Sequence, residues 1–188
     1  MNNELVQITK LAIEGAWIAQ SPVLTDNRGY FREWFRLEEV SPNLGHSFSV
    51  KQANMSSSKR GVVRGIHYSL ISEGQSKWVT CVSGLIWDVI VDLRPNSPTF
   101  KSWVGVYLSP SSGDSLFISE GLGHGFVSLE ENSDVVYLLS SAYSPSHEFE
   151  IHPFDPDIGI EWPISEITLS NKDSEAPSLR QQLESGNL

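Results

Sequence analysis

Leu85-Ile86-Trp87-Asp88-Val89-Ile90-Val91-Asp92-Leu93 is the stretch that decides the fold class of this chain. Successive side chains of a β-strand point to opposite faces, so the residues fall into two sets. One set consists of Trp87, Val89, Val91 and Leu93, and the other of Ile86, Asp88, Ile90 and Asp92. Two carboxylates among isoleucines suit the partly polar interior of a barrel better than a dry sandwich core. Asp88 is expected to be a polar support inside that barrel.

The rest of the chain repeats this pattern of short apolar runs, separated by clusters of Gly, Pro, Asn and Ser. Such spacing is typical of an all-β protein. Strands are expected at 17–20, 48–55, 61–69, 77–82, 85–93, 103–108, 115–118, 124–129 and 135–141. Helices are expected only at 37–40 and, near the C-terminus, at 178–185. With no visible linker, we expect one domain over residues 1–188, built as a jelly roll or a similar small barrel.

Composition limits the function. Of 188 residues, 39% are hydrophobic and 19% charged, and no apolar run approaches the about 20 residues that a membrane-spanning helix needs. The first six residues lack the basic start and apolar core of a signal peptide. Cys81 is the single cysteine and is expected to be a buried, inert thiol. These observations favour the cytoplasm.

The formal net charge of −10 argues against extended binding to nucleic acid, which requires a basic surface. It leaves room for a single nucleotide, because a diphosphate needs only two or three well-placed cations. Arg28, Arg64 and Lys77 could supply them.

The most reactive stretch is Val62-Val63-Arg64-Gly65-Ile66-His67, followed by Lys77. A histidine moves protons near neutral pH, a lysine stabilises an oxyanion, and an arginine holds a phosphate. Together they indicate proton abstraction beside a carbonyl of a phosphorylated substrate. Strict alternation puts Arg64 and His67 on opposite faces, but a bulge at Gly65 could re-aim one of them.

Other candidates are ambiguous when taken singly. His124 lies among three glycines in Glu120-Gly121-Leu122-Gly123-His124-Gly125-Phe126, where a ligand or a turn would fit equally well. A metal shared by His67 and His124 is an alternative, although the His-x-His cluster of metal-binding jelly rolls is missing. By pattern alone, Tyr137 is a core residue and Asp173 lies in a surface turn. Gln52 and Asn54 share parity and would face one pocket, while Tyr143 is a stacking platform or a loop anchor.

Taken together, these segments resemble the dTDP-4-dehydrorhamnose 3,5-epimerase family, from about residue 26 to 177. The matching segments are Asp26-Asn27-Arg28-Gly29-Tyr30-Phe31-Arg32-Glu33, Gln52-Ala53-Asn54-Met55-Ser56, Val63-Arg64-Gly65-Ile66-His67, Gln75-Ser76-Lys77, Trp87-Asp88-Val89-Ile90-Val91-Asp92-Leu93-Arg94, Ser97-Pro98-Thr99-Phe100, the stretch around His124, Tyr137, Tyr143-Ser144-Pro145, Glu148, Ile160-Glu161-Trp162-Pro163 and Leu169-Ser170-Asn171-Lys172-Asp173. Each segment is weakly specific, but all of them in order are a strong signal.

The resemblance implies a cupin-like jelly roll (a double-stranded β-helix), a homodimer, and neither a metal nor another cofactor. It makes His67 the general base with Asp173 as its orienting carboxylate, Tyr137 the proton donor on the opposite face of the sugar, and Lys77 the partner of the C4 oxyanion. It also implies that Tyr143 stacks on thymine and that Arg28, Arg64 and Lys172 hold the diphosphate. The full set of implied substrate-binding residues is Arg28, Glu33, Gln52, Asn54, Arg64, His124, Tyr143, Glu148 and Lys172. Arg28 and Glu33 belong to an N-terminal segment that would serve the neighbouring subunit.

The implied reaction inverts C3 and C5 of dTDP-4-dehydro-6-deoxy-D-glucose to give dTDP-4-dehydro-L-rhamnose. The alternatives are an epimerase or other isomerase that inverts one centre of a related dTDP-4-keto sugar, a metal-dependent jelly-roll enzyme, and a non-catalytic module that binds nucleotide sugars. Two positions depart from the family pattern: Leu138 replaces a common lysine and Ser69 a frequent glutamine. They call into question the detailed shape of the pocket, and with it the inversion of both centres.

Overall fold

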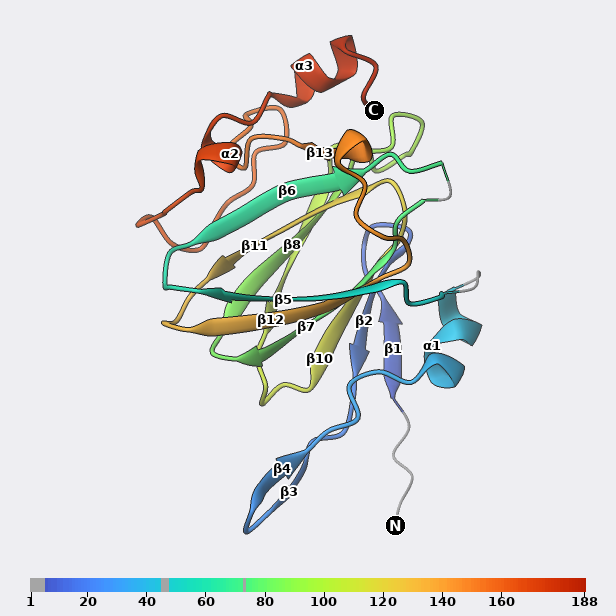
Figure 1. The fold of residues 1–188 in the computed structure, drawn as a ribbon, viewed down its shortest axis with the longest axis vertical. Helices are drawn as coiled ribbons and strands as arrows, with labels where there is room; N and C mark the ends of the chain where they lie inside the picture. Colours follow the sequence, from blue (N-terminus) through green and yellow to red (C-terminus); the bar gives the residue numbers. More distant parts are fainter. Residues whose placement is uncertain (1–5, 45–47, 73) are drawn as a thin grey trace.

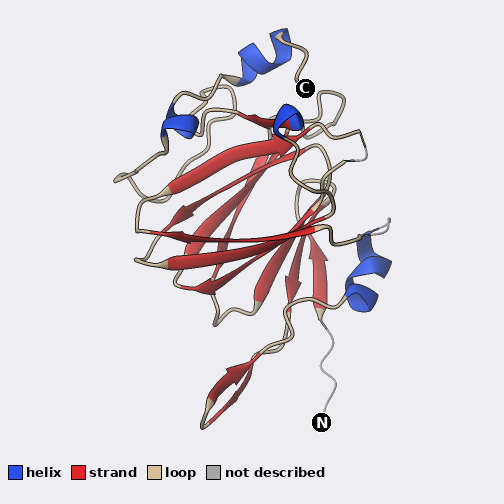
Figure 2. Ribbon diagram, in the orientation of Figure 1, coloured by secondary structure: helices blue, strands red, loops and turns tan. Residues whose placement is uncertain are grey.

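Two antiparallel β-sheets packed face to face form the body of the protein in the computed structural model, which describes residues 6–44, 48–72 and 74–188 (Figure 1). The short helices lie outside the sheets (Figure 2). This architecture confirms the all-β, cupin-like jelly roll. The start of the chain, on which the expectation of no signal peptide depends, lies largely outside the described residues.

The two sheets have six and five strands. The larger has the order β1-β2-β10-β7-β12-β5 and the smaller the order β13-β6-β11-β8-β9. The larger sheet contains β1 (Gln7–Lys10), β2 (Ala16–Gln20), β5 (Gln52–Ser58), β7 (Lys77–Ser83), β10 (Asp114–Ile118) and β12 (Ser133–Leu139). The smaller contains β6 (Val63–Ser69), β8 (Ile86–Asp92), β9 (Trp103–Leu108), β11 (Leu122–Ser128) and β13 (Glu148–Glu150).

A separate two-stranded hairpin, β3 (Leu24–Asp26) and β4 (Gly29–Phe31), projects away from the body (Figure 1). The helices are α1 (Leu37–Leu44), the 3₁₀ turn η1 (Pro145–His147), α2 (Asn171–Ser174) and α3 (Leu179–Glu184). Each of the nine expected strands has a counterpart, whereas β1, β3, β4 and β13 were not expected. The expected strand at 48–55 is wrong at its start, because Phe48 instead packs its ring edge-on against Phe35 and Phe117.

The two faces of β8 both enter hydrophobic cores, as the alternation predicts. Ile86 and Ile90 point between the sheets, where they pack with Val79 of β7 and other residues of the larger sheet. Val89 and Val91 point outward and are covered by the C-terminal segment, which contributes Leu179 of α3. α3 is anchored there by a capping box, in which Ser178 and Gln181 bond each other's backbone. The C-terminal segment thus completes the second core.

Two further expectations concern the whole chain. Cys81 is buried and unpaired, as predicted. Within the described ranges, no helix is both long and apolar enough to cross a membrane.

Asp92, at the end of β8, holds the following turn against the barrel by hydrogen bonds. Its carboxylate is fully buried and accepts hydrogen bonds from the Arg94 guanidinium and from the hydroxyls of Ser97 and Thr99. Burial alone would raise the pKa of this carboxyl, but these hydrogen bonds hold it well below its usual value.

Replacing Asp92 with Asn should therefore destabilise the fold by about 2 kcal/mol, because charge-assisted hydrogen bonds are lost. A carboxyl with a depressed pKa contributes stability above its unfolded-state pKa and loses it as the pH falls through the folded-state value. Urea unfolding at several pH values should show the wild-type advantage at pH 7 shrinking below about pH 4. An advantage that is the same at pH 7 and pH 3 would contradict this assignment.

Candidate active site

A cavity lies between the two sheets, and five of the expected site residues line it. The lining residues are Ser56 of β5, Arg64 and His67 of β6, Lys77 of β7, His124 and Phe126 of β11, and Tyr137 of β12. The strands of both sheets therefore present acid, base and cationic groups to one space of about 160 Å³.

An irregularity between β6 and β11 lets Arg64 and His67 face this cavity together. His67 pairs with His124 and Arg64 pairs with Phe126, so positions three apart on β6 face positions two apart on β11. The extra residue is accommodated at Gly65, which has φ +127°, and the bulge expected there is confirmed. A Cβ atom on Gly65 would lie 2.5 Å from the Cα of Gly125, so only glycine permits this approach.

His67 is paired with Asp173, which lies 106 positions further along the chain. The Nε2 atom of His67 is 2.7 Å from Oδ1 of Asp173. Ser170 caps α2 by accepting from the backbone N–H of Asp173, and its hydroxyl also donates to the other carboxylate oxygen. Burial alone would raise the pKa of Asp173, but the hydrogen bonds from His67, Ser170 and the backbone of Gly65 hold it below its usual value. Asp173 is 4% exposed, so its expected place in a surface turn is wrong.

Lys77 and His124 stand at the buried end of the cavity. Lys77 donates to the backbone carbonyl of His67 at 3.3 Å. Burial lowers the pKa of Lys77 to about 8, although the nearby carboxylates of Glu148 and Asp88 raise it. His124 contacts Asp88 through its Nε2 atom, 2.8 Å from Oδ2. Two histidines thus line the cavity, and each is paired with a buried carboxylate.

The opposite wall is formed by β12 and β5. Tyr137 lies there, and its register neighbour on β5 is Asn54. The Gln52 side chain donates to that of Asn54, which confirms that these two amides face the same way. Sequence reasoning missed Ser56, although it shares the parity of Gln52 and Asn54. Its hydroxyl lines the cavity, is buried, and has no hydrogen-bond partner among the described residues.

Arg64 lines the cavity, whereas Gln52, Asn54, Tyr143, Glu148 and Lys172 are not among its lining residues. The Arg64 guanidinium is held by the hydroxyl of Ser58 and the carbonyl of Ser57. Glu148 accepts from Gln75, and Lys172 forms an ion pair with Glu150 at 3.0 Å. Tyr143 is 61% exposed, and its backbone N–H donates to the Gln52 side chain.

Arg28 and Glu33 are not brought to this cavity. Arg28 lies in the projecting hairpin β3–β4, with its side chain 85% exposed and paired with Asp26. Glu33 follows the hairpin and pairs with Arg36.

Neither departure from the family pattern alters the wall of the cavity. Leu138 points to the outer side of the larger sheet, where it packs in the cluster around Trp78 and Phe48. Ser69 is buried, pairs in register with Glu148 and bonds the backbone of Ile71. The concern that both raised about the pocket therefore does not apply to its lining residues.

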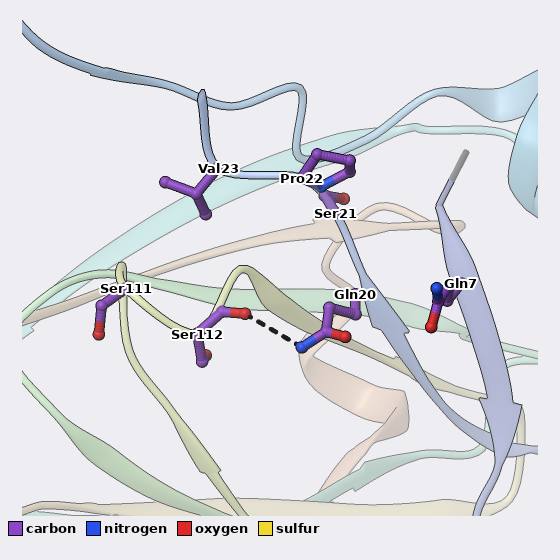
Figure 3. A pocket seen from close by; sticks show the side chains of 7 residues that line it. All are labelled: Gln7, Gln20, Ser21, Pro22, Val23, Ser111 and Ser112. Atoms are coloured by element: carbon purple, nitrogen blue, oxygen red, sulfur yellow. Dashed lines mark hydrogen bonds between the residues drawn. The ribbon is translucent and has the colours of Figure 1, made fainter. Parts of the chain in front are cut away.

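A larger cleft, of about 460 Å³, lies near the ends of β1 and β2 (Figure 3). Its lining includes Gln7, Gln20 and Ser112, and Gln20 donates to the carbonyl of Ser112. No lining residue of this cleft titrates near neutral pH, so the acid–base chemistry belongs to the smaller cavity. Within the described ranges, no group of three or more His, Cys, Asp or Glu side chains is arranged to hold a metal ion.

The fold and the cavity are those of an enzyme built on a jelly roll, with titratable side chains on both walls of the cavity. The chain belongs to the dTDP-4-dehydrorhamnose 3,5-epimerase family of isomerases, whose model matches residues 10–181. It is 45% identical to a dTDP-4-dehydrorhamnose 3,5-epimerase of Mycolicibacterium smegmatis, over 94% of this chain and 88% of that protein. It is also 45% identical to a dTDP-4-dehydro-6-deoxyglucose 3-epimerase of a Streptomyces species, over 90% and 87% of the respective chains.

A solved structure has the same fold throughout. It is the Legionella pneumophila dTDP-6-deoxy-D-glucose-3,5-epimerase in complex with dTDP-4-keto-L-rhamnose. The TM-score is 0.90 at 37% identity, and the match covers 97% of each chain.

Replacing Gly65 with Ala should destabilise the protein more than replacing Gly29, although both glycines have φ near +130°. The difference should be about 2 kcal/mol, because a Cβ atom on Gly65 meets backbone whereas one on Gly29 meets nothing within 4 Å. Urea unfolding followed by circular dichroism measures both variants. Equal losses would show that the contact between β6 and β11 does not require glycine.

Proposed function

We propose that this protein is a dTDP-4-dehydrorhamnose 3,5-epimerase, which inverts C3 and C5 of dTDP-4-dehydro-6-deoxy-D-glucose. The single observation that carries the proposal is the position of His67 and Tyr137 on opposite sheets across one cavity. Inversion requires a base on one face of the sugar and an acid on the other, and this arrangement supplies both.

In the proposed mechanism His67 removes a proton from the carbon next to the C4 ketone. Asp173 accepts a hydrogen bond from Nε2–H of His67, which leaves Nδ1 as the basic nitrogen. The same carboxylate stabilises the imidazolium that forms, because opposite charges attract strongly in a half-buried site. The substrate's own carbonyl receives the electron pair, so the reaction needs no other electron sink.

Lys77 is proposed to stabilise the enolate that results. Its ammonium group lies in the same cavity and would contact O4, where most of the negative charge collects. Tyr137 then donates a proton to the opposite face of the carbon, which inverts it. A second round at the other carbon completes the reaction.

The remaining expected residues are proposed to bind the nucleotide part of the substrate. Arg64 lines the cavity together with His67, and Lys172 precedes Asp173 in α2, so these two cations suit the diphosphate. Tyr143 exposes its ring, which can stack on thymine. Gln52, Asn54, His124 and Glu148 are proposed to contact the substrate as well.

Inversion of C3 alone is the second candidate, and it is favoured by one finding. The chain is as similar to a 3-epimerase as to a 3,5-epimerase, at 45% identity in each case. The residues described above serve either reaction, since both begin with a proton removed next to the ketone.

A reaction in deuterated water distinguishes the candidates. We expect label from solvent at both C3 and C5 of the product, detected by NMR, and label at C3 alone would make the protein a single-centre epimerase.

His67→Ala should lower exchange at both carbons by about a thousandfold, because the base is removed. Tyr137→Phe should reduce net inversion more than exchange.

His152→Ala is the matched control, since this histidine bonds the backbone of Phe154 and does not line the cavity. Its exchange rate should equal that of the wild type. Near-normal turnover in His67→Ala would overturn the assignment of the base.

We also propose that the protein acts as a homodimer, in the cytoplasm, with the β3–β4 hairpin reaching the neighbouring subunit. The hairpin projects from the body (Figure 1). The side chains of Leu24, Tyr30 and Phe31 on it are all more than half exposed. Exposed apolar residues on a projecting arm are typical of an interaction surface. In the dimer, Arg28 and Glu33 would complete the partner's site.

Mixing two weakened variants tests this arrangement. Arg28→Ala lacks the arm cation and His67→Ala lacks the base. If the arm serves its own subunit, no mixed dimer contains an intact site. If it serves the partner, random exchange of subunits should restore about a quarter of the wild-type activity. Activity that stays at the sum of the two variants after exchange would exclude the shared site.

A further inference from the structure

Asp88 is a buried carboxylate that the proposed catalytic steps do not use. It lies on the inner face of β8 with no exposed surface. Oδ2 is 2.8 Å from Nε2 of His124, whereas Oδ1 has no hydrogen-bond partner in the described part of the chain. A buried carboxylate with half of its oxygens unsatisfied is costly for folding, and an apolar residue of similar size would cost less. The stability of the core therefore does not explain its presence.

The position of Asp88 relates it to two groups of the cavity. β8 lies beside β11, where Asp88 pairs in register with Phe126, two positions from His124. Both Phe126 and His124 line the cavity. Lys77 enters the cavity from the opposite sheet, and the carboxylate of Asp88 raises its pKa. Burial raises the pKa of Asp88 itself, whereas His124 and Lys77 oppose that effect and favour the carboxylate. Asp88 thus stands behind the groups that would surround the C4 oxygen.

We propose that Asp88 is a positioning residue, which orients His124 by its hydrogen bond and keeps Lys77 protonated by its negative charge. The inference rests on the proposed function, because it assigns a purpose to the charge of Lys77. By accepting from Nε2–H, Asp88 leaves Nδ1 of His124 available to the substrate. A negative charge near Lys77 favours the ammonium form, which alone can stabilise an oxyanion.

Several charged or titratable groups face Lys77, and they decide how its charge responds to pH. They are Glu148 of β13, Asp88 of β8, Arg64 and His67 of β6, His124 of β11 and Tyr137 of β12. Burial lowers the pKa of Lys77 to about 8, and Glu148 and Asp88 oppose that effect. Without the charge of Asp88, the pKa of Lys77 falls further, so Lys77 loses its proton at a lower pH.

Asp88→Asn tests the proposal, because it keeps the shape of the side chain and removes its charge. We expect the alkaline limb of the kcat profile, measured from pH 6 to 10, to move down by about one pH unit. Asp92→Asn is the matched control: it removes the charge of another fully buried carboxylate on the same strand and face. Its alkaline limb should coincide with that of the wild type, even though its stability is lower.

A readout that needs no activity accompanies the profile. The ¹³Cε signal of Lys77, identified by its loss in Lys77→Arg, reports the titration of this group directly. It should have a midpoint near pH 8 in the wild type and about one pH unit lower in Asp88→Asn. Asp88→Ser supplies a second neutral variant in case Asp88→Asn does not fold.

An unchanged Lys77 titration in a folded neutral variant at position 88 would overturn the proposal, whatever the activity. A wild type that exchanges no substrate proton would instead overturn the proposed function, while the titration still decides the role of Asp88. The two failures are therefore distinguishable.

Discussion

The close approach of β6 and β11 at Gly65 is the constraint on which the cavity depends. Two backbones can come this near only where no Cβ atom intervenes, and both Gly65 and Gly125 meet that condition. The extra residue accommodated there brings Arg64 and His67 to the same side of the strand. The backbone of Gly65 also helps to hold the pKa of the Asp173 carboxyl below its usual value. One glycine thus helps to place His67, Arg64 and Asp173, which are the proposed base, phosphate-binding cation and orienting carboxylate.

Most strands of both sheets could be predicted from the sequence because alternation is a local property. The two faces of β8 were assigned correctly from nine residues, since each side chain's direction follows from its parity. The bulge at Gly65 could also be predicted from the sequence, because a glycine lies between two functional residues of opposite parity and tolerates an irregular backbone. Short strands such as β1 and β13 were missed, because three or four residues, none of them fully buried, carry no clear alternation.

The site was harder to predict than the fold, because its parts are distant in sequence. Asp173 appeared to be a surface residue, since nothing near it in the chain signals burial under β6. Its pairing with His67 was named only through a resemblance to a family. Ser56 could have been found from its parity with Gln52 and Asn54. The positions of Arg28 and Glu33 could not, because the body of one subunit does not hold them near the cavity.

The C-terminal segment that covers the smaller sheet also supplies Asp173, the carboxylate that pairs with His67. The strands that enclose the cavity end at Leu139, whereas Asp173 emerges from the ribosome more than thirty residues later. A chain that ended at Leu139 would therefore contain the strands of the cavity but not the carboxylate that pairs with His67. Proteolysis between the last barrel strand and α2 would likewise separate the two halves of the pair. The proposed base and the carboxylate that would orient it thus depend on a continuous chain from β6 to α2.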